Sequence, residues 1–324
     1  CALPILIKTN TTGDIVWNKT FGGPDFDCGR SVDQTSDEGY IITGYTKSFG
    51  AGNNDVYLIR TDSLGDTLWT KTFGGALNDY GYSVQQTNDL GYIVAGKTYS
   101  FGAGSSDVYL IKTDANGNTI WTKSFGGTLP DAGNSVQQTS DGGYIITGET
   151  FSFGAGSYDV YLIKTNINGD LLWSKTYGES DGIDIGDFVR QTTDGGYIIT
   201  GQTTSFGATT AEVLLLKVDS TGNTVWSPEP LKIFGSASNN DYGVSVQQTS
   251  DGGYIITGQT QSFGAGGSDV YLIKINADGD SSNSCGTNGV VPVVTSPSTV
   301  VNSTATIVGS GATVTNPEPS SVIQ

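Results

Sequence analysis

Carboxylates recur at two fixed places along this sequence, and pairs of carboxylates can act as general acid and base, as they do in glycosidases. The first set lies in polar turns just before a Gly-Tyr-Ile segment and comprises Asp37, Asp89, Asp141, Asp194 and Asp251. The second set opens an apolar run and comprises Asp55, Asp107, Asp159, Glu212 and Asp269. Five near-equal copies would make five near-equal sites, whereas catalysis normally uses one asymmetric constellation. We therefore interpret both sets as structural turn and strand-start residues.

The sequence contains no histidine. This absence removes the commonest general base, the Ser-His-Asp triad and every His-ligated metal site. The turn at residues 276–280 is acidic like a calcium loop, but it lacks the glycine at the sixth position and the distal glutamate of an EF-hand. The segments expected to lie innermost carry mainly glutamines and offer nothing that would hold an anionic cofactor. We therefore predict that the protein is not an enzyme and binds no cofactor or metal.

Composition narrows the partners and the location. The 324 residues carry a net charge of −17, which argues against a nucleic-acid partner because phosphate binding needs a positive face. No apolar run approaches the length of about 18 residues that a membrane span needs. The absence of methionine favours an exported, mature chain that is extracellular or on the cell surface. Cys1, Cys28 and Cys285 leave open one disulfide, a lipid-modified Cys1 or free thiols.

A repeat of about 52 residues organises the chain. Tryptophans recur at steps of 52, 52, 52 and 53, at Trp17, Trp69, Trp121, Trp173 and Trp226. A period near 50 with strand-like content is typical of β-propeller blades. The copy at residues 106–156 and its continuation predict four strands, at 135–139, 144–150, 159–165 and 171–177. The fold class predicted is therefore all-β, a five-bladed β-propeller over residues 1–267.

The third and fourth strands of each unit carry a family resemblance. The segment VYLIKTDANGNTIW resembles the repeat of quinoprotein-type (PQQ-like) propellers, with an acidic residue, a glycine turn and a tryptophan after the apolar strand. The matching residues are Asp62, Gly65 and Trp69; Asp114, Gly117 and Trp121; Asn166, Gly169 and Trp173; and Asp219, Gly222 and Trp226. The resemblance implies that each tryptophan docks between adjacent blades. The whole unit is also similar to tandem repeats of secreted microbial surface proteins of unknown role.

The strand count leaves one strand in excess. The apolar third strand occurs six times, and the other three types occur five times each. The N-terminal residues 5–21 supply only a third and a fourth strand. We expect this hairpin to complete the C-terminal blade with the first and second strands at residues 245–260, which would leave residues 268–285 as a free strand and connector. The alternative is that residues 269–275 stay in their own blade and the N-terminal strand is displaced.

Residues 286–324 differ from the repeats. Glu318 is the only charge in this tail, which is otherwise rich in valine, threonine and serine. Such segments form strands readily and aggregate when exposed, so the tail needs a partner. Fully extended, it would reach roughly 130 Å at about 3.3 Å per residue, far enough to lie along another subunit.

These features predict a surface structural protein that assembles with copies of itself into a filament. The free strand and the tail would add to strand edges of a neighbour, with a disulfide from Cys285 to Cys1 or Cys28 as a lock. The residues expected to make this contact are Asp269, Val270, Tyr271, Leu272, Ile273, Val300, Thr306, Ile307 and Val308.

The alternative function is a multivalent glycan-binding lectin or adhesin whose tail is an anchor. Its sites would be the aromatic residues of the five Ser-Phe-Gly loops, which are expected on one face of the ring. These residues are Phe49, Phe101, Phe153, Phe206 and Phe263. The competing interpretation is that each phenylalanine fills the gap between blades.

Overall fold

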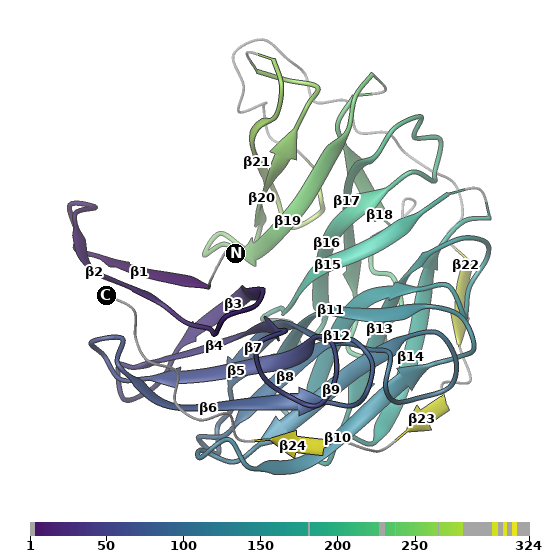
Figure 1. Cartoon of the computed structure of the whole chain (residues 1–324). Helices are drawn as coiled ribbons and strands as arrows, with labels where there is room; N and C mark the ends of the chain where they lie inside the picture. Colours follow the sequence, from purple (N-terminus) through teal and green to yellow (C-terminus); the bar gives the residue numbers. More distant parts are fainter. Residues whose placement is uncertain are drawn as a thin grey trace. The chain divides into compact units, whose positions relative to one another are not determined.

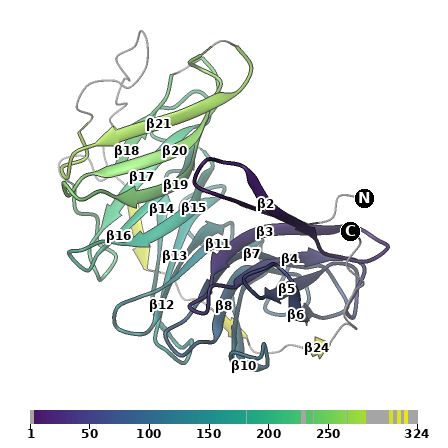
Figure 2. The same cartoon turned by 90° about the vertical axis from the view of Figure 1, so that its left-hand side faces the viewer.

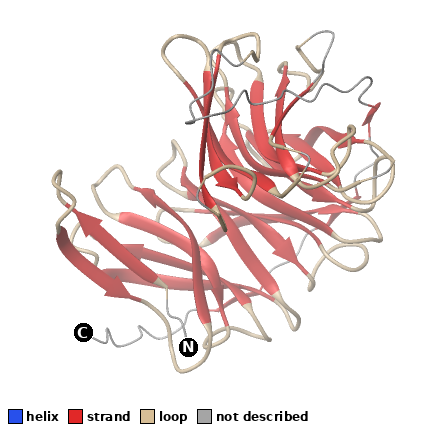
Figure 3. Ribbon diagram, turned by 90° about the horizontal axis from the view of Figure 1, so that it is seen from above, coloured by secondary structure: helices blue, strands red, loops and turns tan. Residues whose placement is uncertain are grey.

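The computed structural model describes residues 4–180, 182–226, 231–236, 238–264, 266–280, 300–303, 307–309 and 313–315. All regular secondary structure in these ranges is β-strand (Figure 3), and no helix there could span a membrane. The chain divides into two compact units, Cys1–Gln138 with Ile307–Gln324, and Thr139–Thr306. The prediction of an all-β chain of repeated four-stranded sheets is confirmed, whereas the closed five-bladed ring stays a prediction.

The first unit contains two complete antiparallel four-stranded sheets in chain order (Figure 1). The first sheet consists of β3 (Asp27–Gln34), β4 (Tyr40–Thr46), β5 (Asp55–Thr61) and β6 (Thr67–Gly74). The second consists of β7 (Asp79–Gln86), β8 (Tyr92–Thr98), β9 (Asp107–Thr113) and β10 (Thr119–Gly126). A separate N-terminal hairpin, β1 (Ile5–Thr9) with β2 (Ile15–Thr20), precedes them, and β11 (Asp131–Gln138) follows them.

The second unit repeats the same pattern. Its strands are β12 (Tyr144–Thr150), β13 (Asp159–Thr165) and β14 (Leu171–Gly178), then β15 (Asp184–Gln191), β16 (Tyr197–Thr203), β17 (Glu212–Val218) and β18 (Leu231–Phe234). It ends in a three-stranded sheet of β19 (Asp241–Gln248), β20 (Tyr254–Thr260) and β21 (Asp269–Ile275), with β21 at the edge (Figure 2).

Burial follows the strand type. All seven residues are buried in each third strand of a four-stranded sheet, as expected for an apolar run that is covered on both faces. The first strands begin earlier than predicted, for example at Asp131 rather than Ser135. In β7 the register shifts between Gly81 and Ser83, and the four extra residues include an aspartate and a glycine, which strand propensity does not favour.

Tryptophans join neighbouring sheets, as predicted. The ring of Trp69 packs edge-on against Tyr92 of the next sheet at 5.7 Å, and a Cβ on Gly117 would lie 2.8 Å from the same indole. Gly117 also has a φ of 73°, so both the space and the turn require glycine there. Within each unit the same contact occurs for Trp17 with Tyr40, Trp173 with Tyr197, and Trp226 with Tyr254.

The prediction of a free strand at residues 269–275 is wrong. β21 pairs with β20 along its whole length, from Thr260 opposite Asp269 to Tyr254 opposite Ile275. The N-terminal hairpin likewise keeps its own pairing, with Ile5 opposite Thr20. Both hairpins are local, and short loops close at lower entropic cost than pairing across most of the chain. The repeat fold therefore extends past residue 267. Residues 269–275 stay in their own sheet, as the alternative had it, whereas the N-terminal strand is not displaced from its hairpin.

The C-terminal tail forms short strands on its own chain. β22 (Val300–Ser303) pairs antiparallel with β14, β23 (Ile307–Gly309) with β10, and β24 (Thr313–Thr315) with β6. They appear in yellow beside the fourth strands of three successive sheets (Figure 1). The tail therefore forms strands, as predicted, and in this structure its partner is the chain itself.

Candidate functional site

The outer edge of the fourth strand is a repeated acceptor for an added strand. The tail residue Val314 lies opposite Phe73, Val308 lies opposite Phe125, and Val301 lies opposite Tyr177. These partners occupy the same repeat position, the aromatic residue before the glycine that ends each strand. An edge strand offers unpaired N–H and C=O groups, and main-chain bonds of this kind supply affinity in strand addition. Among the described residues, the outer edges of β18 and β2 carry no tail strand.

The last strand of the last sheet, β21, has an exposed face and, among the described residues, an unpaired edge. Val270 in β21 is 86% exposed, whereas Val213 at the same position of β17 is fully buried. Within the described residues no strand pairs with the outer edge of β21. The predicted assembly residues Asp269, Val270, Tyr271, Leu272 and Ile273 therefore lie in a strand that is paired on one edge and open on the other.

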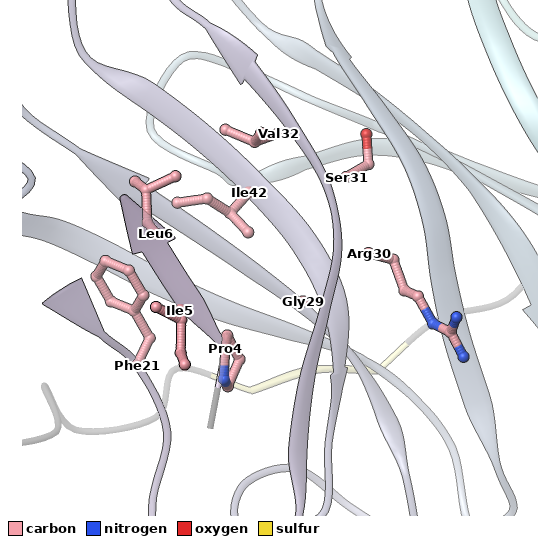
Figure 4. Close-up of a pocket in the computed structure, with 9 residues that line it drawn as sticks. All are labelled: Pro4, Ile5, Leu6, Phe21, Gly29, Arg30, Ser31, Val32 and Ile42. Carbon is pink, nitrogen blue, oxygen red and sulfur yellow. The ribbon is translucent and has the colours of Figure 1, made fainter. Parts of the chain in front are cut away.

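The first sheet is also partly uncovered. Val32 in β3 is 51% exposed, whereas Val84 at the same position of β7 is 5% exposed. The hairpin β1–β2 covers only part of this face and leaves a cavity of about 200 Å³ against β3 and β4. Pro4, Leu6, Phe21 and Ile42 line its apolar side, and the guanidinium of Arg30 points away from them (Figure 4).

Carboxylates in the turns between first and second strands are counter-ions. Lys217 Nζ lies 2.9 Å from Asp194 Oδ2, and the lysine side chain is 3% exposed while the aspartate is 59% exposed. Despite partial burial, hydrogen bonds from Thr192 and Lys217 lower the pKa of Asp194 to about 2. The same pairing joins Arg60 with Asp37, Lys112 with Asp89, Lys164 with Asp141, and Lys274 with Asp251. This set therefore has the structural role predicted for it.

The five loop phenylalanines are packed rather than presented. Four of them lie against third-strand tyrosines at ring-centroid distances of 5.6 to 5.9 Å: Phe49 on Tyr57, Phe101 on Tyr109, Phe153 on Tyr161, and Phe263 on Tyr271. Phe206 is 2% exposed. Glycan binding stays a prediction, since Phe49, Phe101, Phe153 and Phe263 are half-buried and only Phe206 is fully buried.

Four carboxylates of the second set, all but Asp269, form buried pairs that the sequence reasoning missed. The carboxylate opening a third strand faces the aspartate that opens the first strand of the next sheet, across the glycine that ends the fourth strand. At Gly235, a Cβ would lie 1.5 Å from Glu212 Oε2 and 2.6 Å from Asp241 Oδ2. The other pairs are Asp55 with Asp79, Asp107 with Asp131, and Asp159 with Asp184. The available signal was the Phe-Gly or Tyr-Gly end of each fourth strand, followed by an aspartate about five residues later.

Burial governs the electrostatics of these pairs. It raises the pKa of Asp55 to about 6, and the neighbouring Asp79 carboxylate adds to the rise. It raises the pKa of Glu212 to about 7, again with a contribution from the facing Asp241. Burial also raises the pKa values of Asp107, Asp159 and Asp184 to about 6. No group of three or more Asp, Glu or Cys side chains in the described residues is placed to hold a metal ion.

The structure describes Cys28 and some of the tail residues for which predictions were made. Cys28 in β3 is a free, half-buried thiol that donates a hydrogen bond to the Gly29 carbonyl at 3.6 Å. Cys1, Cys285 and Thr306 lie outside the described residues, so the lipid and disulfide alternatives stay predictions. Val300 lies in β22, and Ile307 and Val308 lie in β23.

Comparison with known proteins gives one distant relative. No family model matches the chain. The chain is 26% identical over 199 residues to the regulatory protein FlaEY of Caulobacter vibrioides, an alignment that covers 53% of this chain and 20% of that protein. The chain thus spans about a fifth of the length of the curated relative that it matches.

Proposed function

We propose that this chain is an exported structural repeat protein that assembles with copies of itself into an extracellular filament by strand exchange. The exchanged element is the tail, residues 286–324, which leaves its own sheets and adds to the fourth-strand edges of a neighbour. The observation that carries the proposal is the common position at which β22, β23 and β24 meet three different sheets. A segment that fits equivalent edges of its own chain fits the same edges of a second copy equally well.

The chemistry of the tail supports exchange rather than a permanently closed subunit. Each tail strand is three or four residues long, so each contributes few main-chain hydrogen bonds. Between and beyond them the tail carries almost no charge that would keep it in water. Exchange preserves every strand pair while joining two subunits, which is the low-cost route to association by domain swapping.

The open faces at the two ends belong to the same proposal. The hairpin β1–β2 and the sheet β19–β21 together contain all four strand types of one further four-stranded repeat. One strand of the third type is in excess. Their meeting would close a five-bladed β-propeller and cover Val32 and Val270. The quinoprotein-type resemblance of the repeat supports this closure, since those repeats form closed rings.

Electron microscopy and light scattering of two chains test the proposal. The full chain is compared with a truncation after Asp280, which retains β21 and removes only the tail. Filaments or concentration-dependent mass growth in the full chain, together with single particles of the truncation, would support strand exchange. Identical single particles in both samples at high concentration would contradict it.

A regulatory role is a second candidate, favoured only by the printed name of the FlaEY match. It would require a partner other than a second copy. Cross-linking of the full chain in its own cells, followed by mass spectrometry, separates the candidates. Cross-links that join copies of the chain support assembly, whereas cross-links to one other protein support regulation.

A further inference from the structure

The buried carboxyl pairs contain oxygens that receive no hydrogen bond from the described residues. Glu212 and Asp241 are 1% and 0% exposed, and neither Glu212 Oε2 nor Asp241 Oδ1 has a hydrogen-bond donor in the described structure. The first pair is similar, because Asp55 Oδ1 has no donor while Asp79 faces it. Two ionised carboxylates held this close and out of water repel each other strongly.

The described groups that face these two pairs carry no positive charge. Thr210 donates to Glu212 Oε1 at 3.4 Å, while Ser262 and the Ser236 amide donate to Asp241 Oδ2 at 2.6 and 3.2 Å. The phenol of Tyr271 is buried beside both carboxyls, and they raise its pKa in addition to the rise caused by burial. Around Asp55, the amides of Ala51 and Gly52 donate to Oδ2, and the phenol of Tyr109 lies near both acids. In both pairs the facing oxygen of the first-strand aspartate, Asp241 Oδ2 or Asp79 Oδ2, accepts from neutral donors, whereas the facing oxygen of the third-strand acid, Glu212 Oε2 or Asp55 Oδ1, has none.

A metal ion does not fit this site. Calcium takes six to eight oxygens and magnesium six. The Glu212–Asp241 and Asp55–Asp79 junctions each offer two carboxylates and one phenol, and the described residues contain no larger group of Asp, Glu or Cys. A proton needs only two facing carboxyl oxygens, which is what each junction provides.

We propose that each buried carboxyl pair binds one proton, so that the acid opening the third strand of one sheet donates a hydrogen bond to the carboxylate opening the next sheet. At the last complete sheet, Glu212 Oε2–H donates to Asp241 Oδ2. The proton replaces repulsion by a charge-assisted hydrogen bond between neighbouring sheets. The proton is the only ligand that we propose for these sites, and each of the four pairs would bind one.

If the pairs bind protons, the stability of the sheet junctions depends on pH. Burial, aided by the facing carboxylate, raises the pKa of Glu212 to about 7 and that of Asp55 to about 6. Folding near pH 5 to 6 should therefore take up roughly one proton per pair relative to the unfolded chain. A structure of this kind is most cohesive in mildly acidic surroundings and loosens at its sheet junctions as the pH rises.

Glu212→Gln tests the proposal, because a glutamine amide can donate to Asp241 without a titratable proton. Its thermal midpoint is compared with that of the unchanged protein at pH 5 and pH 8, with Asp219→Asn as a control in the exposed turn of the same sheet. We expect the midpoint of the unchanged protein to fall between pH 5 and 8, and that of Glu212→Gln to fall less. A glutamine variant that loses as much as the unchanged protein would overturn the proposal.

Two further measurements keep the test decisive if the variant folds poorly. Infrared spectroscopy of the unchanged protein at pH 6 should show a protonated-carboxyl band that fades by pH 8, and absence of the band at pH 6 would overturn the proposal. Calcium or magnesium that raises the midpoint of the unchanged protein at pH 8, but not that of Asp55→Asn, would assign the pairs to a metal and also overturn it.

Discussion

Glu212 and Asp241 meet across Gly235, where both carboxyl groups would collide with any Cβ. The contact joins the third strand of one sheet to the first strand of the next, and the same three-part arrangement recurs at Gly74, Gly126 and Gly178. Acids that look like simple strand-start residues in the sequence therefore lie at the junctions between neighbouring sheets. Their spacing from the glycine is what makes the contact possible.

We predict that the stability of the protein falls as the pH rises from about 4 to 8. The carboxyls of Asp55, Asp107 and Asp159 have folded-state pKa values near 6, above their ordinary value of 3.8. A raised folded pKa gives stability that is complete below the unfolded value and is lost as the pH rises through the folded value. Urea unfolding across this range measures the effect, and a midpoint that rises steadily toward pH 8 would contradict it.

Asp194→Asn should destabilise the second unit by about 2 kcal/mol at pH 7. The substitution leaves the buried Lys217 without its counter-ion, and the exposure of Asp194 reduces the cost below that of a fully buried pair. Because the pKa of Asp194 is lowered to about 2, this contribution is present above about pH 4 and disappears as the pH falls toward 2. Urea titrations at pH 7 and pH 2.5 check both points, and a loss that is equal at the two pH values would refute the assignment.

Gly178→Ala should cost more stability than Gly195→Ala. The new Cβ at position 178 would lie 1.7 Å from Asp159 Oδ1, so the carboxyl pair must separate, at a cost of about 3 kcal/mol. A Cβ at position 195 meets nothing within 4 Å, and its cost of about 1 kcal/mol comes only from the left-handed backbone there. Equal losses in thermal unfolding would mean that the pair does not restrict this glycine.

Val270→Lys should destabilise the chain more than Leu68→Lys, although both side chains are exposed in this structure. Closure of the ring would bury Val270, whereas Leu68 lies at a strand position that is exposed in each repeat where it is described. We expect a difference of about 1 to 2 kcal/mol in urea unfolding. Identical losses would show that the face of β21 stays open.

The sequence predicted the repeat more reliably than its junctions. Second and third strands were placed to the residue, as at Tyr144–Thr150 and Asp159–Thr165, because each is an apolar run bounded by glycine turns. The start at Asp131 was missed because the first four residues of this strand, Asp-Ala-Gly-Asn, have low strand propensity. The free strand at Asp269–Ile275 was wrong because counting strand types ignores how local hairpins close. The carboxyl pairs were missed because each joins residues of two neighbouring sheets, and the residue spacing within one repeat does not show which residues of the next repeat lie nearby.

Strand exchange between copies is the central claim, and disulfide trapping measures it most directly. Lys175 lies opposite Ser303 where β14 meets β22, so cysteines at these two positions can bridge the pair. One copy carries Lys175→Cys and another carries Ser303→Cys, each with the three native cysteines replaced by serine. Mixing and mild oxidation should yield a covalent dimer of the two different copies. A disulfide that forms only when both cysteines are on one chain, with no mixed dimer at any concentration, would contradict the account.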